Sequence, residues 1–351
     1  MWEVSGVPES SLPRVSVVVP SHNYARYLDE AIASALDQTG VDVDVIIVDD
    51  ASTDDSLRIA RGWEEADDRV RVIAHGCNHG HIATFNEALG SATAPYLVKL
   101  DPDDVLAPGA LRRAADVLGA HPGVAFVYGP VLPFEGATPT LPDYPPPSLR
   151  PVTIWPGHRW IWQRARRLRN VILQPEVMIR TEALHEVGGH RVEVPAASDL
   201  NLWLRLASIG DVARLHGPVQ GLYRRHAASM STTIHAGKLA DLRARRLAFE
   251  LFLEEAGHRL AFRGDFAQVL QRALARDALR LAFEELDDGH DVRPYLWEAQ
   301  DVWPDVVRTL KWWSLTRQLN AGGPMWWGLP GRAQRDLDGR LRWRLWRRYG
   351  I

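Results

Sequence analysis

The sequence has very little cysteine and no long apolar run. Cys77 is the only cysteine among the 351 residues, so an intramolecular disulfide is excluded and a reducing compartment is expected. No apolar stretch is long enough to cross a bilayer, and the first residues lack the basic and then apolar pattern of a secretory signal. We therefore expect a cytoplasmic protein.

Two glycine-rich nucleotide motifs are also absent. The expected first strand runs into SHNYARY and not into GxGxxG, which argues against a dinucleotide-binding turn. No GxxxxGK followed by Ser or Thr occurs, so a P-loop is excluded. A net charge of −3 gives no general attraction for nucleic acid, and we expect no nucleic-acid partner. Any bound phosphate would then be held through a metal ion.

Short apolar runs alternate with amphipathic segments over the first 130 residues, which predicts a mostly parallel, doubly wound α/β sheet with crossover helices. The expected strands are 15–20, 43–49, 70–75, 95–100 and 124–128. The expected helices are 24–37, 53–67, 81–89 and 108–118. The runs VSVVVP and VDVIIVDD are apolar almost to their last residues, which is typical of central strands covered on both faces.

The pattern changes after residue 128. Residues 129–156 accumulate prolines, among them Pro145, Pro146 and Pro147, and are predicted to form a long loop that borders a substrate site. We next expect a strand in PEVMIR, helices in TEALHEVGG and SDLNLWLRLASIG, and a strand pair in VARLHGPVQGLYRRH. Beyond about residue 236 the spacing of apolar residues is helical, and no strand signal follows.

Carboxylates follow two of the expected strands. The strand at 43–49 ends in Asp49 and Asp50, and the strand at 95–100 is followed by Asp101, Asp103 and Asp104. Ligands of an open parallel sheet bind beyond the carboxyl ends of its strands. Crowded like charges raise each other's pKa unless a cation neutralises them, and carboxylate oxygens suit Mg²⁺ or Mn²⁺. We expect such a divalent metal together with a diphosphate, although the second group also fits a turn before the helix near Pro108.

Residues from about 14 to 231 resemble the family 2 glycosyltransferases of the GT-A fold. Five segments carry the resemblance: VSVVVPSHNYARYLDEAIASALDQ, VIIVDDASTDDS, NHGHIATFNEALGSATAPYLVKLDPDD, SDLNLWLRLA and YRRHAASMS. The resemblance implies a GT-A domain over 1–235, with a nucleotide-sugar half at about 14–130 and an acceptor half at about 157–235. A helical region rich in Trp and Arg would occupy 236–351. The implied activity is inverting transfer of a sugar from a nucleoside diphosphate sugar to an acceptor hydroxyl.

The resemblance also implies roles for individual residues. Asp199 would be the general base, and Asp103 and His226 would contact the metal ion. The donor would be bound by Pro20, His22, Asn23, Asp49, Asp50, Asn78, Asn86 and Asp101. From local pattern alone, Asp199 also fits a first-turn acid of a helix, His226 a surface histidine, and the two later asparagines turn or capping residues.

Three departures from the family pattern keep an alternative open. His22 stands where relatives often have a Tyr that stacks on the base, Ser198 stands where many have Glu, and Asn201 where many have a second acid. The alternative is a catalytically weak or inactive nucleotide-sugar binding protein of the same fold. A UDP-sugar is the favoured donor, and GDP- and dTDP-sugars remain open.

The C-terminal region falls outside the resemblance. We expect a helical appendage that packs its tryptophans onto the catalytic domain. The segment 339–351, GRLRWRLWRRYGI, alternates arginine with tryptophan densely enough to suggest a peripheral membrane contact, a dimer contact or a site for an acidic partner. The first of these would suit a lipid-linked acceptor, whereas a saccharide is the other acceptor considered.

Overall fold

The computed structural model describes residues 12–141, 152–226 and 237–321, and the chain divides into two compact units. Unit 1 comprises Met1–Val152, Gln174–Glu186 and Leu215–Arg224. Unit 2 comprises Thr153–Leu173, Val187–Arg214 and Arg225–Ile351. Each unit combines segments that are far apart in the sequence. The sequence boundary near residue 236 stays a prediction.

Unit 1 contains a mixed sheet in which six strands follow the order β3-β2-β1-β4-β9-β6. These strands are β1 (Arg14–Ser21), β2 (Asp42–Asp49), β3 (Val70–Ala74), β4 (Tyr96–Lys99), β6 (Val124–Tyr128) and β9 (Met178–Arg180). β1 to β4 run parallel, whereas β9 is antiparallel to both β4 and β6. The register places Ser21 opposite Asp49, so the loops after β1 and β2 start side by side.

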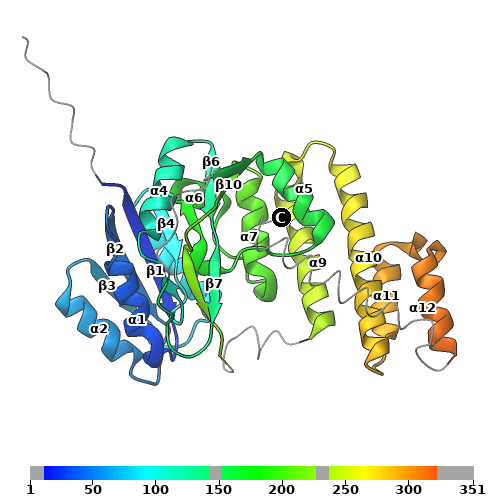
Figure 1. Ribbon diagram of the computed structural model, residues 1–351, viewed down its shortest axis with the longest axis horizontal. Coiled ribbons are helices and arrows are strands. Elements are labelled where there is room, and N and C mark those ends of the chain that lie inside the picture. The colour runs from blue at the N-terminus through cyan, green and yellow to red at the C-terminus, as the bar shows by residue number, and fades with distance from the viewer. Residues whose placement is uncertain (1–11, 142–151, 227–236, 322–351) are drawn as a thin grey trace, which may run out of the picture. The chain divides into compact units, whose positions relative to one another are not determined.

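Helices pack on this sheet as the alternating pattern predicts (Figure 1). They are α1 (Ala25–Leu36), α2 (Ser56–Ala66), α3 (His81–Ser91), α4 (Ala110–Ala120) and α6 (Thr181–Val187). α1 contacts β2 and α2, α3 contacts β1 and β2, and α4 contacts β6 and β9. In α1 the buried residues are Leu28, Ala31, Ile32, Ala35 and Leu36, which is the spacing of one helix face.

A second, three-stranded sheet of unit 1 has the order β5-β11-β7. It consists of β5 (Val105–Leu106), β7 (Val131–Phe134) and β11 (Gly221–Arg224). β11 runs antiparallel to β5 and parallel to β7. At Gly221 an added Cβ would lie 2.8 Å from the carbonyl oxygen of Pro175, so only glycine fits this close approach. This small sheet connects the residues after Asp104 with β11.

Three sequence expectations are corrected here. The strands expected as a pair in residues 212–226 are β10 (Asp211–Leu215) and β11, and they belong to different sheets. The expected long loop at 129–156 includes β7 and β8 (Val152–Trp155), while Pro145 to Pro147 lie outside the described residues. Strand β5 stands between the second group of aspartates and α4, so that group does not lead directly into a helix.

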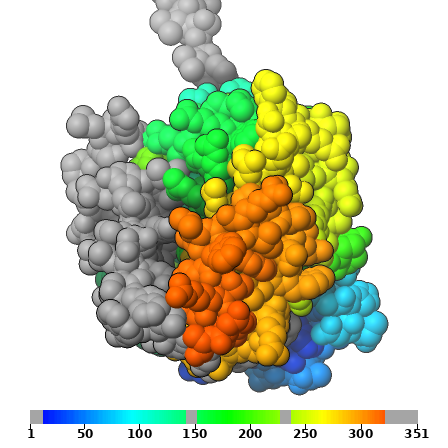
Figure 2. Space-filling view, turned by 90° about the vertical axis from the view of Figure 1, so that its right-hand side faces the viewer, coloured from blue at the N-terminus to red at the C-terminus, as the bar shows by residue number. Residues whose placement is uncertain are grey.

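Unit 2 is mainly helical (Figure 1). Figure 2 shows the surface that its C-terminal helices form, in yellow to orange. Its helices are α5 (Gly157–Arg167), α7 (Ser198–Ala207), α9 (Lys238–Glu255), α10 (Arg263–Asp287), α11 (Arg293–Val302) and α12 (Leu310–Asn320). α7 contacts α5 and α9, and α10 contacts α5, α9, α11 and α12. The helical character expected beyond residue 236 is thus confirmed for residues 237–321. Over the described part of the chain, no helix combines the length and apolarity needed to cross a bilayer.

The tryptophans of the C-terminal helices are not uniformly packed. The indole of Trp297 is 60% exposed and that of Trp313 is 69% exposed. The expectation that these aromatics pack inward is therefore wrong for these two residues. The segment 339–351, with its arginines and tryptophans, lies outside the described residues.

Candidate active site

The first acidic pair, Asp49 and Asp50, lies at the carboxyl end of β2, where the apolar strand ends. Both carboxylates are almost completely buried, with 1% and 2% of their surface exposed. Asp49 accepts a hydrogen bond from the Ser52 backbone N–H at 3.0 Å through Oδ2. Its Oδ1 has no hydrogen-bond partner among the described residues. Because a buried acceptor without a donor is costly, this oxygen is suited to a ligand donor.

Asp50, in contrast, has both oxygens occupied by groups of its own chain. Oδ1 accepts from the backbone N–H of His79 at 2.7 Å and from His75 Nδ1 at 2.7 Å. Oδ2 accepts from the backbone N–H of Gly80 at 2.8 Å, at the start of α3. Burial alone would raise the pKa of Asp50, but the bonds from His79, His75 and Gly80 outweigh it and lower the pKa. Asp50 is therefore an ionised anchor for residues 75–80.

His75 connects Asp50 to α3. Its Nε2 donates to the Glu87 carboxylate at 2.9 Å, and its ring stacks on His79 with 4.3 Å between centroids. Burial lowers the pKa of His75, but the two carboxylates raise it further than burial lowers it. Potential ligand atoms of Asp50, His75 and His79 lie within 4.8 Å of one another, as in a metal site. Because both His75 nitrogens and both Asp50 oxygens already have partners, we interpret this group as a hydrogen-bonded unit.

The loop after β1 is tied to the loop after β2. Asn23 has a positive φ of 60°, and its Oδ1 accepts from the Thr53 backbone N–H at 2.7 Å. Its own N–H donates to Ser52 Oγ at 3.0 Å. His22 Nδ1 donates to the Asp50 carbonyl oxygen at 2.7 Å. The predicted donor-binding residues His22 and Asn23 therefore lie beside the first acidic pair and fix its loop.

The remaining predicted donor residues of the first half have simpler surroundings. Asn78 Oδ1 accepts from the Gly80 backbone N–H at 3.0 Å, which is the turn-forming role considered for it. Asn86 is half-buried on α3, and Pro20 is half-buried opposite Val48 in the β1–β2 pair. Neither position tests a contact with a nucleotide, so these roles stay predictions.

The second acidic loop, residues 101–104, follows β4. Asp104 is completely buried, and its Oδ1 accepts from the Arg224 backbone N–H at 2.9 Å. Burial, followed by the charges of Asp101 and Asp103, raises the pKa of Asp104 well above its usual value. Asp104 Oδ2 has no hydrogen-bond partner among the described residues. Asp101 and Asp103 are half-buried, and Lys99 Nζ lies 2.8 Å from Asp101 Oδ1.

Tyr24, in the loop after β1, lies close enough to the second acidic loop for the charges of that loop to affect its hydroxyl. Burial raises the pKa of its hydroxyl, and the charges of Asp103 and then Asp101 raise it further. The phenol therefore stays protonated at neutral pH. Sequence analysis missed Tyr24, although it lies in the quoted SHNYARY segment next to two residues that were assigned.

Arg224, at the end of β11, is the second functional residue that sequence analysis missed. Its side chain is buried and donates from Nε to the Asp103 carbonyl oxygen at 2.8 Å and from Nη1 to the Gly136 carbonyl oxygen at 2.6 Å. Nη2 pairs with the Glu30 carboxylate. The guanidinium also lies 4.9 Å from the ring centroid of Tyr27 and 4.5 Å from that of Phe134. One buried cation thus holds the second acidic loop in place.

The second acidic loop fits a divalent cation in its donor chemistry. Asp101 and Asp103 offer carboxylate oxygens, and Asp104 Oδ2 is a buried oxygen without a described partner. Within the described ranges these three do not converge as closely as the Asp50 group does. They suit an ion that takes one or two protein ligands and completes its shell with phosphate and water, which is typical of Mg²⁺. His226 is half-buried and belongs to unit 2, so its role at the metal stays a prediction.

Asp199 lies in the first turn of α7, in unit 2. Its Oδ1 is 3.5 Å from His190 Nε2, and 34% of its side chain is exposed. Arg205 stabilises the segment before His190 by donating to the carbonyl oxygens of Val187 and Gly189 at 2.5 and 2.6 Å. Burial, followed by the charge of Arg191, lowers the pKa of Arg205 to about 10. Asp199 is thus partly exposed and lies next to the His190 imidazole, whose preceding segment is held by Arg205.

Asn201 has a structural role that explains its departure from the family pattern. It is fully buried, its Nδ2 donates to the Ala248 carbonyl oxygen at 3.0 Å, and its Oδ1 accepts from Arg205 Nε at 2.8 Å. Ser198, the other departure in α7, is also buried. An acid at position 201 would lose the bond to Ala248, so the amide here joins α7 to α9.

Residues 16–184 match the model of the family described as glycosyl transferase family 2. This match covers just under half of the chain, which is thus similar to the family over these residues. An uncharacterized glycosyltransferase of Nostoc sp., alr2836, is 41% identical over 105 residues, which are 30% of this chain and 32% of that protein. The chain spans about a fifth to a third of the length of the first four curated relatives that it matches.

Solved structures show the same fold for this chain. Residues 1–349 of S. aureus TarS in complex with UDP-GlcNAc align with a TM-score of 0.58 and 19% identity, covering 84% of this chain and 81% of that one. The mannosyltransferase PcManGT of Pyrobaculum calidifontis, in complex with GDP-Man and Mn²⁺, aligns with a TM-score of 0.50 and 20% identity, covering 87% and 91%. The predicted GT-A type fold is thereby confirmed.

Proposed function

We propose that this protein is a family 2 glycosyltransferase that transfers a sugar from a nucleoside diphosphate sugar to an acceptor hydroxyl with inversion, using a divalent metal. The observation that carries the proposal is the meeting of two acidic groups at one end of the unit 1 sheet. Tyr24, beside the first acidic pair, has its pKa raised by Asp103 and Asp101 of the second acidic loop. Strand ends of this kind are where ligands bind in open α/β sheets.

The first acidic pair is assigned to the nucleoside. Asp49 Oδ1, buried without a described partner, would accept a hydrogen bond from the base or ribose. Asp50 would act by holding residues 75–80, because its own oxygens are occupied. His22, Asn23 and Pro20 would shape the same pocket from the β1 side, Asn78 from the loop before α3, and Asn86 from α3.

The second acidic loop is assigned to ribose and metal. Asp101 would bind the ribose, and Asp103 would hold Mg²⁺ or Mn²⁺, with His226 as the further metal ligand expected from the sequence. When bound, such an ion supplies positive charge that stabilises the departing diphosphate. Tyr24, held protonated beside this loop, would add no negative charge of its own.

Asp199 is assigned as the general base. Its carboxylate would take the proton of the acceptor hydroxyl as the oxygen attacks the anomeric carbon. His190, 3.5 Å away, would orient the carboxylate. A single displacement of this kind inverts the anomeric centre. The absence of an acid at position 201 does not weaken the assignment, because Asn201 is tied to Ala248 and Arg205.

The proposal specifies the chemical class of the donor and of the acceptor. A UDP-sugar is the first donor to test, with GDP- and dTDP-sugars next; the two aligned structures hold UDP-GlcNAc and GDP-Man. The acceptor would be a hydroxyl of a saccharide or of a lipid-linked sugar. A cytoplasmic protein with peripheral membrane contact through residues 339–351 is part of this proposal.

A thermal-shift panel of these donors, with and without Mn²⁺, tests the proposal. A donor that binds only the folded chain raises the melting temperature. Asp103→Ala should abolish the metal-dependent part of that shift and reduce donor hydrolysis or transfer by at least about 100-fold, because the leaving diphosphate loses its counter-charge. Asp116→Ala is the matched control, since among the described residues Asp116 pairs only with exposed Arg112 on α4.

Two outcomes would contradict the proposal. If no donor stabilises the wild-type chain and Asp103→Ala behaves as Asp116→Ala does, the metal and donor assignments fail. If a donor binds but is neither hydrolysed nor transferred to any acceptor, the chain is a nucleotide-sugar binding protein of the same fold.

A further inference from the structure

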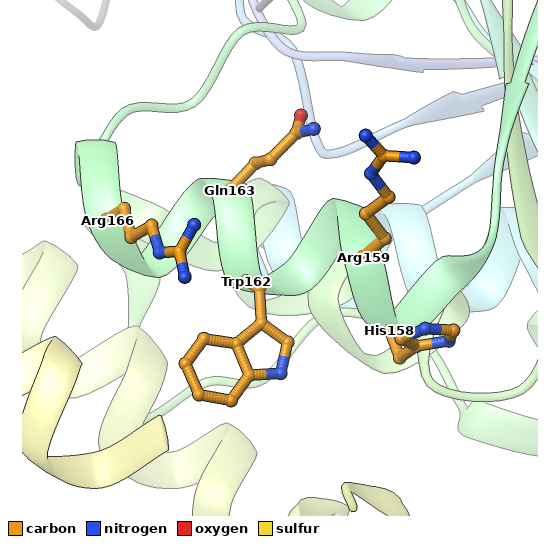
Figure 3. Close-up of a pocket in the computed structure, with 5 residues that line it drawn as sticks. All are labelled: His158, Arg159, Trp162, Gln163 and Arg166. Atoms are coloured by element: carbon orange, nitrogen blue, oxygen red, sulfur yellow. The ribbon is translucent and has the colours of Figure 1, made fainter. Parts of the chain in front are cut away.

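Helix α5 of unit 2 carries a basic pocket that none of the roles above uses. The pocket has a volume of about 380 Å³ and is lined by His158, Arg159, Trp162, Gln163 and Arg166 (Figure 3). These positions follow the four-residue repeat of a helix, so the side chains share its outer surface. The opposite surface of α5 is buried through residues such as Trp160 and Ile161. The pocket therefore belongs to the free side of a well-anchored helix.

The positive charge of this pocket is not compensated by neighbouring acids. α5 has the sequence GHRWIWQRARR and contains no Asp or Glu. Within the described residues, neither Arg159 nor Arg166 lies within ion-pair distance of a carboxylate. The arginines of α9 in the same unit behave differently, as Arg243 pairs with Glu298 and Arg246 with Glu298 and Asp301.

This contrast has a physical meaning. Two guanidiniums left without acids on one helix face repel each other at modest cost in water, and that cost turns into binding energy when an anion arrives. The guanidinium is planar and donates two parallel hydrogen bonds, which matches the oxygens of a phosphate or carboxylate. Because the acids near α9 neutralise Arg243 and Arg246, whereas Arg159 and Arg166 on α5 have no such acids, the α5 pocket keeps positive charge for an external anion.

The other lining residues add a surface for a sugar ring. Trp162 is half-buried, and its ring meets the buried Phe266 edge-on with 5.3 Å between centroids, which fixes its plane. The Arg166 guanidinium lies 5.6 Å from the Trp162 ring centroid. Gln163 Oε1 is buried without a hydrogen-bond partner among the described residues, so it can accept from a hydroxyl. Flat aromatic area beside a few polar groups is the usual make-up of a small-molecule site.

We propose that the α5 pocket binds an anionic saccharide, that is, a sugar segment bearing phosphate or carboxylate groups, as part of the acceptor. The proposal rests on the transferase function proposed above, because it specifies that the acceptor of that reaction is negatively charged. A neutral glycan would use Trp162 and Gln163 but leave Arg159 and Arg166 uncompensated. The volume of the pocket falls at the lower end of the range of small-molecule sites.

Direct binding of labelled oligosaccharides to the full chain tests this site, with fluorescence anisotropy as the readout. Three probes of equal length are a phosphodiester-linked, a carboxylate-bearing and a neutral oligosaccharide. The wild-type chain should bind one of the charged probes at least about 10-fold more tightly than the neutral one, and the affinity should fall as salt rises. The better of the two charged probes identifies phosphate or carboxylate as the recognised group.

The double variant Arg159→Gln/Arg166→Gln should lose that preference, with Kd for the charged probe rising about 10-fold or more. Arg276→Gln/Arg293→Gln is the control, because it removes the same charge from exposed positions on α10 and α11. Equal losses in both double variants, or equal binding of charged and neutral probes by wild type, would overturn the proposal. The UDP-sugar thermal shift should be unchanged in the α5 variant, so a missing donor shift in wild type refutes the transferase function and not this site.

Discussion

Asp50 and Asp104 are both buried carboxylates at one end of the unit 1 sheet, yet the chain surrounds them differently. Asp50 accepts hydrogen bonds from two backbone N–H groups and His75, and its pKa is lowered. Asp104 accepts from one backbone N–H, faces two further aspartates, and has a raised pKa. Asp50 is thus stabilised by the fold alone, whereas the second acidic loop keeps unbalanced negative charge.

The difference indicates a division between a preformed pocket and a loop that awaits a cation. In the first, the loops after β1, β2 and β3 are joined through Asn23 and Asp50 before any ligand binds. In the second, one residue from a distant strand, Arg224, supplies the positive charge that holds the backbone. Changes at Arg224 should therefore reduce stability more than changes at the first acidic pair, because fewer contacts hold the second acidic loop.

Arg224→Ala should have the largest effect. It leaves Glu30 and the carbonyl oxygens of Asp103 and Gly136 without their donor. Glu30 is exposed, so the main loss is that of the two hydrogen bonds from the buried guanidinium to backbone carbonyl oxygens, each worth roughly 1.5–3 kcal/mol of unfolding free energy. We expect a loss of this size in urea unfolding, together with loss of the Mn²⁺-dependent donor shift.

Two further variants isolate the cause of that loss. Arg224→Lys keeps the charge but not the planar fork, so it should recover part of the stability and little of the donor shift. The exposed neighbour Arg225 is the control, and Arg225→Ala should change stability by less than about 0.5 kcal/mol. Wild-type stability in Arg224→Ala would refute the view that this arginine holds the second acidic loop.

Asp50→Asn should have a smaller but clear effect. The amide presents an N–H₂ group to donors that now bind a carboxylate oxygen, and hydrogen bonds to a charged group are the stronger kind. We expect a loss of roughly 2 kcal/mol in unfolding free energy and a weaker donor shift that is independent of metal. Asp55→Asn, whose side chain is 67% exposed in the same segment, should change neither quantity. If Asp50→Asn weakened only the Mn²⁺-dependent part of the donor shift, Asp50 would belong to the metal site and not to a preformed nucleoside pocket.

The sequence predicted the parts of the fold that local pattern determines. β1 and β2 are apolar to their ends because both faces are covered, and α1 buries residues at helical spacing, so both signals were readable. The clusters at Asp49 and Asp101 were found for the same reason, since carboxylates directly after such strands are conspicuous. The small sheet was missed because β5 has only two residues and pairs with β11 more than a hundred residues later.

Arg224 and Tyr24 were missed for a related reason. The partners of Arg224 at Glu30, Asp103 and Gly136 are 194, 121 and 88 residues away in sequence, so nothing local marks it. Tyr24 is significant only because the second acidic loop lies near its hydroxyl. The sequence indicated which carboxylates matter, and the tertiary structure adds the groups that balance their charge.

The smallest predicted effect concerns pH and His75. Its pKa is raised in the folded state above 6.5, so its stabilising contribution is complete below that value and is lost as pH rises through the folded pKa. The Asp50 pKa is lowered below 3.8, so its contribution is present above that value and is lost only in acid. His75→Gln should therefore cost roughly 1 kcal/mol near pH 5.5 and less near pH 9, measured by urea unfolding at both pH values. His121→Gln, an exposed histidine after α4, should cost little at either pH. A cost for His75→Gln that grows toward pH 9 would mean that the imidazole is held neutral, and the first acidic pair would then carry more uncompensated charge than its hydrogen bonds indicate.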